Sequence, residues 1–451
     1  MFRRHLIQEL QGWKIDKNRK PLILRGARQT GKTTLIKMFS QEFEQFISLN
    51  LELSADRRIW DGEPNFNDLL RNIELTKNTR ILPGKTLLFL DEIQNEPRAI
   101  QSLRYFYEQK PDLHVIATGS LLEVSLKQKG FSFPVGRVSF LYLHPLRFDE
   151  FLTAIQKDRI GEELNHLCFS SKISPTLHAL AEEQYKEYLY VGGMPESVKI
   201  FSETKNHSSL KNFKEGLLAS FEEDVPKYAR PAQTHYIRFL IQHAPLFAGQ
   251  RIQYANFANS GHRSREMRQA FETLEKAMIL QRISGNVQTI APMQPNLRVA
   301  PKLLFLDTGL VAHKLGVDFM TLKGTGELND LFRGTFSEQA AGQALMAQKT
   351  LTRETPLFWY RHHPGSIAEI DYCITVRGKI IPVEVKSGKT GTLRSLLQFM
   401  EEAPHPYAVR VYSGPLQMDS ILTPKQKKIC LLSVPFYMVH RLEEIIENWM
   451  D

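Results

Sequence analysis

The segment GARQTGKT, residues 26–33, constrains the fold of this chain more than any other part of the sequence. It follows the apolar run of residues 21–24, precedes the helix-like stretch 34–39, and fits the pattern G-x-x-x-x-G-K-S/T. Between a strand and a helix, this pattern forms a loop whose backbone N–H groups enclose phosphate oxygens. A plain strand-to-helix turn is the alternative. We favour a phosphate-binding loop in an α/β domain, because the pattern fixes several positions at once.

The residue types in this loop suit different parts of a nucleotide. Gly26 and Gly31 permit a tight backbone path around the phosphates. Lys32 is placed to reach the terminal phosphates, and the hydroxyl of Thr33 is a magnesium ligand. ATP and Mg²⁺ are therefore the expected cofactors. The expected nucleotide-binding residues are Gly26, Ala27, Arg28, Gln29, Thr30, Gly31, Lys32, Thr33 and Thr34.

An apolar run that ends in two acids supplies the second part of such a site. In KTLLFLDEIQ, residues 87–90 are typical of a strand buried in a parallel sheet, and Asp91 and Glu92 follow directly. We expect Asp91 to hold magnesium through water, and Glu92 to orient the water that attacks the phosphate. Together, the two motifs predict that the chain binds ATP and hydrolyses it through Glu92.

Two further segments contribute candidates to the same site. The predicted strand LHVIATGS, residues 113–120, ends in Thr118 and Ser120, either of which is placed to hydrogen-bond the attacked γ-phosphate. Arg137 stands just before another predicted strand, residues 138–143. An ordinary surface arginine is the alternative for Arg137.

These motifs, followed by LHPLRFDEFL and YLYVGGMPESV, resemble in their order a family of archaeal and bacterial AAA-plus ATPases with a C-terminal domain of unknown function. The resemblance implies that Thr118 or Ser120 is the residue called sensor 1, and that Arg137 reaches the nucleotide of a neighbouring subunit. It also implies that Gly193 and Pro195 form the GxP element with which a helical lid contacts adenine. By itself, Gly-Gly-x-Pro would only indicate a turn.

Beyond residue 209 the pattern becomes helical and resembles a helix-turn-helix followed by two strands around the polar loop 284–301. We therefore predict a winged-helix domain. Its last helix has an apolar face with spacings of three and four, comprising Met267, Ala270, Phe271, Leu274, Ala277 and Met278. On or before its other face lie His262, Arg263, Arg265, Arg268 and Gln269. Such a helix fits a DNA major groove, or else the domain only packs against the ATPase.

The C-terminal part contains two β-rich runs, residues 370–376 and 379–386, that flank Arg377-Gly378 as a hairpin. With a two-residue loop, Val376 pairs with Lys379 and Asp371 falls opposite Glu384. The period of two puts Lys386 on the same face as Glu384. Two carboxylates and a lysine thus converge.

This constellation is the one that a PD-(D/E)xK phosphodiesterase uses. Asp371 and Glu384 are expected to hold a divalent cation that activates a water, Lys386 to stabilise the nucleophile, and Glu338 to add a third acid from an earlier helix. The AAA-plus resemblance likewise implies a nuclease-like fold here. An exposed cross-strand ion pair between Glu384 and Lys386 is the alternative.

Composition limits the class of protein. The 58 Lys and Arg against 49 Asp and Glu, a formal charge of +9, favour an acidic partner such as DNA. The three cysteines are far apart, which argues against a disulfide framework and a thiolate zinc site. The start lacks an apolar signal region, and about 18 consecutive apolar residues occur nowhere, so we expect a cytoplasmic protein without membrane contact.

The sequence therefore predicts an α/β protein with a P-loop AAA-plus core, and four domains. These are an ATPase core at 1–150, a helical lid at 151–208, a winged helix at 209–318 and a PD-(D/E)xK nuclease-like domain at 319–451. The favoured function is an ATP-hydrolysing protein that acts on DNA. The alternative is a STAND-type signalling switch, in which ATP controls assembly with other copies or a protein partner and the last domain only docks.

Overall fold

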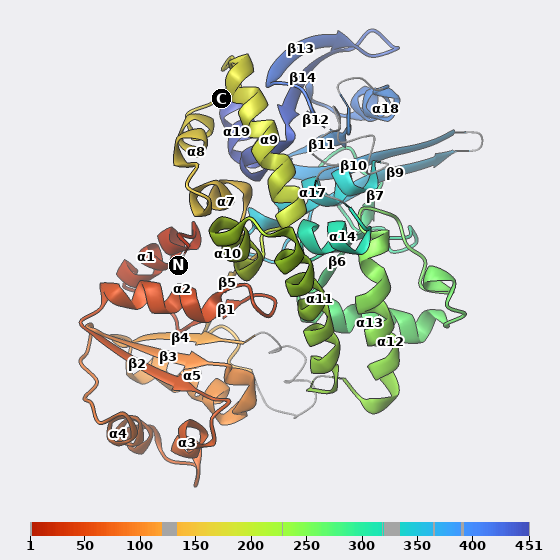
Figure 1. Ribbon diagram of the computed structural model, residues 1–451. Coiled ribbons are helices and arrows are strands. Elements are labelled where there is room, and N and C mark those ends of the chain that lie inside the picture. The colour runs from red at the N-terminus through yellow and green to blue at the C-terminus, as the bar shows by residue number, and fades with distance from the viewer. Residues whose placement is uncertain are drawn as a thin grey trace. The chain divides into compact units, whose positions relative to one another are not determined.

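The structure is a computed structural model that describes residues 2–119, 133–227, 229–317, 319, 334–363, 366–388 and 392–450. The chain divides into two compact units (Figure 1). The first is Met1–His144 with the short segments Lys276–Met278 and Lys349–Arg353, and the remainder forms the second. The expected boundary at 150 thus lies near the observed change of unit, whereas the divisions expected at 208 and 318 fall within the second unit and stay predictions.

The first unit is built on a five-stranded parallel sheet in the order β2-β3-β4-β1-β5. Its strands are β1 (Leu22–Arg25), β2 (Gln45–Asn50), β3 (Thr86–Asp91), β4 (His114–Thr118) and β5 (Ser139–Tyr142). Its helices are α1 (Leu6–Ile15), α2 (Lys32–Phe39), α3 (Ser54–Arg57), α4 (Phe66–Lys77) and α5 (Pro97–Gln109).

Helices cover both faces of this sheet (Figure 1), as the apolar strands require. Alternate residues of β3 enter two separate cores: Leu88 and Leu90 pack with α4 and α5, whereas Leu87 and Phe89 pack with α1 and α2. This alternation follows from the period of two along a strand. The buried parallel strand predicted from residues 87–90 is observed.

The second unit begins with a group of helices. They are α7 (Phe148–Ala154), α8 (Asp158–Asn165), α9 (Pro175–Val191), α10 (Pro195–Thr204), α11 (His207–Asp224), α12 (Pro231–His243), α13 (Ser264–Lys276) and α14 (Thr308–Lys314). Proline at the first position and the hydroxyl of Ser174, which accepts the N–H of Leu177, start α9. Within the described ranges, no helix is long and apolar enough to cross a membrane.

Four of the six residues expected on the core face of α13 are buried in it, with Met267, Ala270, Phe271 and Leu274 at 1% exposure or less. Ala277 and Met278 lie beyond the end of the helix, and Met278 is only partly buried. After α13, β6 (Leu280–Ile283) and β8 (Lys302–Phe305) pair antiparallel. The residues between them do not form a free wing. Their β7 (Gly285–Asn286) joins the C-terminal sheet, and Trp359 Nε1 donates to the carbonyl of Val287 at 3.2 Å. The reason is that this polar-looking loop carries apolar side chains, and Ala291 and Met293 pack against the core of that sheet.

The C-terminal part is a seven-stranded mixed sheet in the order β13-β14-β12-β11-β10-β9-β7. Its other strands are β9 (Leu357–His363), β10 (Ser366–Val376), β11 (Lys379–Val385), β12 (Tyr407–Tyr412), β13 (Gln417–Leu422) and β14 (Lys428–Pro435). The accompanying helices are α17 (Thr335–Ala347), α18 (Arg394–Glu402) and α19 (Leu442–Trp449). Apolar residues of α18 pack against one face of this sheet.

The predicted hairpin in this sheet is confirmed, with Val376 paired to Lys379 and the ladder running on to Tyr372 opposite Val383. Arg377 and Gly378 have φ of 48° and 70°, as a two-residue hairpin turn with both central residues left-handed requires. A bulge in β10 between Ile370 and Cys373 shifts its register with β9. The bulge lets Ile370 and Cys373 enter the same apolar cluster although they are three residues apart.

Candidate functional sites

The phosphate-binding loop lies between β1 and α2, where the sequence predicts it. Ala27 to Gly31 form the bend, and Lys32, Thr33 and Thr34 form the first turn of α2. Gly31 has φ of 93°, a conformation that favours glycine. A Cβ on Gly26 would lie 2.5 Å from the carbonyl oxygen of Leu143, so a larger residue does not fit there.

Lys32 is folded back onto its own loop. Its Nζ donates to the carbonyl oxygens of Gly26 at 3.0 Å and Ala27 at 2.9 Å. Burial lowers the pKa of Lys32 to about 8, although the nearby carboxylates of Glu92 and Asp91 oppose that shift. A buried ammonium that donates its hydrogen bonds to neutral carbonyl oxygens is well suited to accept an anion.

Asp91, the last residue of β3, links the end of the neighbouring strand β4 to the first turn of α2. Its Oδ2 accepts the hydroxyl of Thr33 at 2.8 Å, and its Oδ1 accepts the hydroxyl of Thr118. The sheet order explains this meeting, because β4, which ends in Thr118, lies between β1 and β3. A carboxylate and a hydroxyl oxygen thus converge beside the loop, and both are ligand types that Mg²⁺ prefers.

Glu92 follows Asp91 in a left-handed conformation, with φ of 52°, which turns it out of the strand direction. Its Oε2 accepts a hydrogen bond from Nε2 of Gln94 at 2.5 Å. Gln94 is buried, and its role could not be predicted from the sequence, because an amide three residues past the strand has no recognisable pattern. The geometry makes Gln94 the residue that orients the Glu92 carboxylate.

The roles of the other residues predicted for the ATPase site stay predictions. Arg137 Nε donates to Glu108 at 3.1 Å on the surface of the first unit, and its action on a neighbouring subunit stays a prediction. Ser120 lies outside the described residues. Gly193 and Pro195 lie at the start of α10 in the second unit, so their contact with adenine also stays a prediction.

Gly193 has partners inside the second unit. Its N–H donates to Oδ2 of Asp307 at 2.6 Å, and its carbonyl accepts the N–H of Leu146 at 2.7 Å. Asp307 is buried and also caps α14 by accepting the N–H of Leu310 at 3.2 Å. Asp307 therefore joins two helix starts far apart in sequence, and this role was missed in the sequence.

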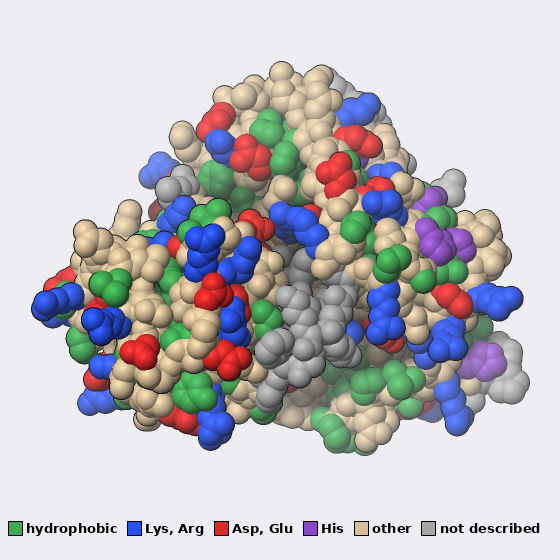
Figure 2. Space-filling view, turned by 90° about the horizontal axis from the view of Figure 1, so that it is seen from below, with side chains coloured by type: hydrophobic (Ala, Val, Ile, Leu, Met, Phe, Trp, Pro, Cys, Tyr) green, Lys and Arg blue, Asp and Glu red, His purple; other side chains and the backbone are tan. Residues whose placement is uncertain are grey.

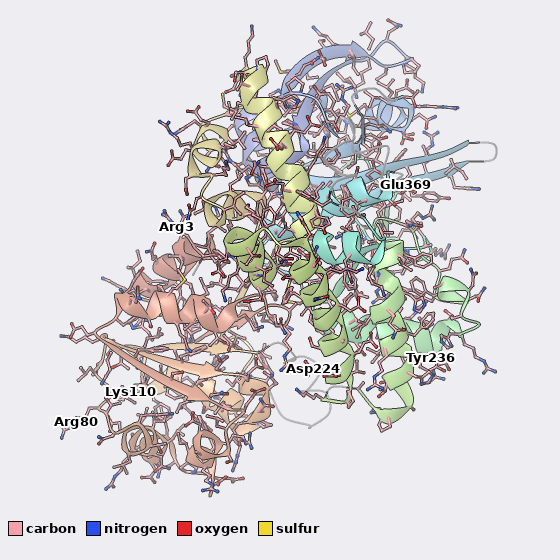
Figure 3. All side chains as sticks on the ribbon, viewed as in Figure 1. Arg3, Arg80, Lys110, Asp224, Tyr236 and Glu369 are labelled. Atoms are coloured by element: carbon pink, nitrogen blue, oxygen red, sulfur yellow. The ribbon has the colours of Figure 1, made fainter. Side chains whose placement is uncertain are left out.

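A second cluster of charges surrounds the C-terminal hairpin. Glu338, in the first turn of α17, and Asp371, on β10, approach the same group, the ammonium of Lys302 on β8. The distances from Lys302 Nζ are 2.5 Å to Glu338 Oε2 and 3.4 Å to Asp371 Oδ1. Glu369, labelled in Figure 3, is a third carboxylate, 3.4 Å from Lys302.

Glu384 and Lys386 form the other half of this cluster. Lys386 Nζ lies 2.6 Å from Glu384 Oε1, while Glu384 Oε2 is buried without a hydrogen-bond partner in the described structure. Asp371 Oδ2 accepts the N–H of Val385 at 2.8 Å, which places Asp371 beside the end of β11. The predicted convergence of these side chains is observed, but Lys302 and Glu369 were not foreseen.

The crowding of carboxylates changes their proton affinity. Burial, and then the negative charge of Asp371, raises the pKa of Glu338 to about 8 and that of Glu384 to about 7. Burial alone would lower the pKa of Lys302, but Asp371 and Glu338 outweigh it and hold that pKa well above its usual value. Among the described residues, no group of three or more acids, histidines or cysteines has the geometry of a metal site.

Comparison with known proteins assigns the first of these sites to a domain class. Residues 18–152 match the family model of an AAA domain, and residues 182–321 and 333–425 match two domains of unknown function. No curated protein matches the chain. The first unit therefore carries an AAA-type P-loop ATPase domain, a class that binds and hydrolyses ATP.

Similar solved structures include the Walker-type ATPase PABY2304 of Pyrococcus abyssi, with 15% identity and a TM-score of 0.44, covering 70% of this chain and 96% of that chain. The Aeropyrum pernix ORC2 protein, in ADPNP–ADP complexes, has 12% identity and a TM-score of 0.28, covering 62% and 88%. These similarities are too low to transfer a domain arrangement or a function to this chain.

Proposed function

We propose that this protein hydrolyses ATP with Mg²⁺ and acts on DNA through a winged-helix-like region around α12 and α13 and a nuclease-like C-terminal domain. One observation carries the ATPase part. The hydroxyls of Thr33 and Thr118 bind the two oxygens of a single carboxylate, Asp91, beside the phosphate loop. Such an arrangement brings together a loop that binds phosphate, a magnesium ligand pair and a residue placed to contact the γ-phosphate.

Each side chain has one task in this mechanism. Thr33 and Asp91 would hold Mg²⁺, which supplies positive charge to the β- and γ-phosphates. Lys32 exchanges the carbonyls of Gly26 and Ala27 for phosphate oxygens. Glu92, oriented by Gln94, holds the attacking water in line and receives its proton.

ATP binding is expected to depend on pH through Lys32, whose pKa is about 8 without nucleotide. ATP needs the charged ammonium, so above pH 8 the protein must first take up a proton. The affinity is then expected to fall by about tenfold per pH unit. Calorimetric titration of ATP between pH 7 and 9.5, in buffers of different ionisation enthalpy, measures the affinity and the number of protons taken up. A constant affinity without proton uptake over that range would contradict the role of Lys32 in binding ATP.

The case for DNA rests on α13 and the loop before it. Arg263, Arg265 and Arg268 are exposed on the side away from the buried face of the helix. The guanidinium of Arg268 lies 5.1 Å from the ring of Tyr254, which restricts its position. On the face in Figure 2, Lys and Arg side chains are interspersed with acidic ones. This cluster of arginines on and just before α13 therefore supports DNA contact better than the modest net charge does.

Replacing Arg263 and Arg265 together by Ala is expected to weaken duplex DNA binding and to reduce the slope of log K against log salt by up to about 2. Fluorescence anisotropy at several salt concentrations measures this. Lys17→Ala with Arg80→Ala, two exposed cations of the first unit, is the matched control. Equal losses in both double variants would mean that α13 has no special part in binding.

A second candidate function is an ATP-controlled assembly switch whose C-terminal domain docks without cutting nucleic acid. The internal ion pairs of the C-terminal acids favour it, because Lys302 and Lys386 already neutralise part of the cluster. ATP hydrolysis with and without duplex or single-stranded DNA separates the two candidates when DNA cleavage is scored in the same tube. ATP hydrolysis that is stimulated by DNA supports the favoured function. If DNA neither binds to the protein nor changes its ATP hydrolysis, the result supports the switch.

A further inference from the structure

The ammonium of Lys302 occupies a built cation-binding position. The side chain is 1% exposed, and its Nζ lies within 3.4 Å of carboxylate oxygens from Glu338, Glu369 and Asp371. The rings of Tyr372 and Phe358 lie 5.3 Å and 5.7 Å from the same Nζ, a distance at which aromatic faces attract a cation. The three acids come from α17 and β10, and the cation comes from β8.

The acids in this cluster outnumber its ammonium groups. Glu384, the fourth carboxylate, has Oε1 paired to Lys386, but its Oε2 is buried without a partner in the described structure. The residue itself is 6% exposed. A buried carboxylate oxygen without a donor is costly, so it marks a place where a further cation or donor would be stabilised.

With the side chains in their observed positions, the carboxylate cluster has no place for a divalent cation beside Lys302. Oxygens of Asp371 and Glu338 face Lys302, and the other oxygen of Asp371 accepts the N–H of Val385. A metal between Asp371 and Glu384 would place its double charge next to a fixed ammonium.

We propose that Lys302 is an intramolecular substitute for a divalent cation, and that this carboxylate centre takes a hard divalent metal only when the Lys302 ammonium is removed. Metal-dependent cleavage by the C-terminal domain then requires Lys302 to leave the acids. This inference goes beyond the proposed ATPase, because it concerns side chains of the second unit alone.

The test uses the full chain without nucleotide and Mn²⁺ as the probe, because Mn²⁺ prefers carboxylate oxygens and free Mn²⁺ has a strong paramagnetic resonance signal. Lys302→Met keeps an unbranched side chain that is one atom shorter and removes its charge. We expect a lower Tm than wild type without metal, one additional bound Mn²⁺ per chain, and a rise in Tm on adding Mn²⁺. Adding Asp371→Asn to this variant is expected to abolish the extra ion and the rise in Tm.

Two further variants keep the proposal falsifiable if Lys302→Met folds poorly. Lys302→Met with Glu338→Gln removes one charge of each sign and is expected to gain the same Mn²⁺ site. Lys302→Arg keeps the positive charge and is expected to gain none. The proposal is overturned if wild-type protein binds an Mn²⁺ ion that Asp371→Asn removes, or if the folded variants without the Lys302 ammonium bind no more Mn²⁺ than wild type. ATP hydrolysis is measured separately and reports on the first unit. Its loss would contradict the proposed ATPase function without bearing on the Mn²⁺ result.

Discussion

Replacement of Glu92 by Gln is expected to reduce steady-state ATP hydrolysis by about 10²–10⁴-fold while ATP is still bound, because the amide cannot accept a proton from the attacking water. The hydrogen bonds of the groups proposed to bind ATP do not involve the Glu92 side chain, since Lys32 donates to the carbonyls of Gly26 and Ala27, and Thr33 donates to Asp91. Phosphate release and binding of a fluorescent ATP analogue, measured on the same preparation, separate the two effects.

Glu52→Gln is the matched control for this variant, because Glu52 is an exposed acid in the same unit and follows β2. It is expected to hydrolyse ATP at the wild-type rate. If Glu92→Gln still hydrolysed ATP, another group would have to orient the attacking water, and the proposed mechanism would be wrong. Loss of nucleotide binding as well would indicate that Glu92 supports the loop rather than the chemistry.

Replacement of Asp307 by Ala is expected to lower the free energy of unfolding of the second unit by about 3–5 kcal/mol. It deprives the buried N–H of Gly193 of its acceptor and removes the cap of α14. It also removes the charge that offsets the burial of Lys214, whose side chain is buried and whose pKa is lowered by burial to about 8. Urea unfolding measures the global loss.

Hydrogen exchange supplies a local measurement for the same prediction. Amides of residues 190–196 and 307–314 are expected to exchange faster in Asp307→Ala than in wild type. Asp307→Asn keeps a carbonyl acceptor of the same shape, so we expect about half the loss of stability. Equal stability of Asp307→Ala and wild type would show that the link between α10 and α14 contributes nothing.

The residues of the ATPase site were predictable because their chemistry follows local order. A phosphate loop needs its glycines, lysine and threonine at fixed spacing, and Asp91 needs only the end of a buried strand. The hairpin at Arg377 was predictable for the same reason, since a two-residue turn sets the register of both strands. No such rule applies to Gln94, which acts on Glu92 through a side-chain hydrogen bond.

The course of the chain between β6 and β8 could not be predicted from the sequence pattern. Residues 284–301 are rich in polar and proline residues, as a free wing would be, yet β7 joins the C-terminal sheet within this segment. A two-residue strand is too short to leave a periodic signal. Its place depends on Phe358 and Trp359, its partners on β9, which lie more than 70 residues further along the chain.

The sequence by itself determined the phosphate loop, the acidic end of a buried parallel strand, and the hairpin that brings Asp371 to Glu384. Each depends on the spacing of neighbouring residues, and the backbone has few ways to satisfy it. The tertiary structure alone decided that Lys302 enters the carboxylate cluster and that Asp307 holds Gly193. Both contacts join residues that are far apart in the chain, and burial makes them specific, because a charge removed from water must find its partners wherever the fold supplies them.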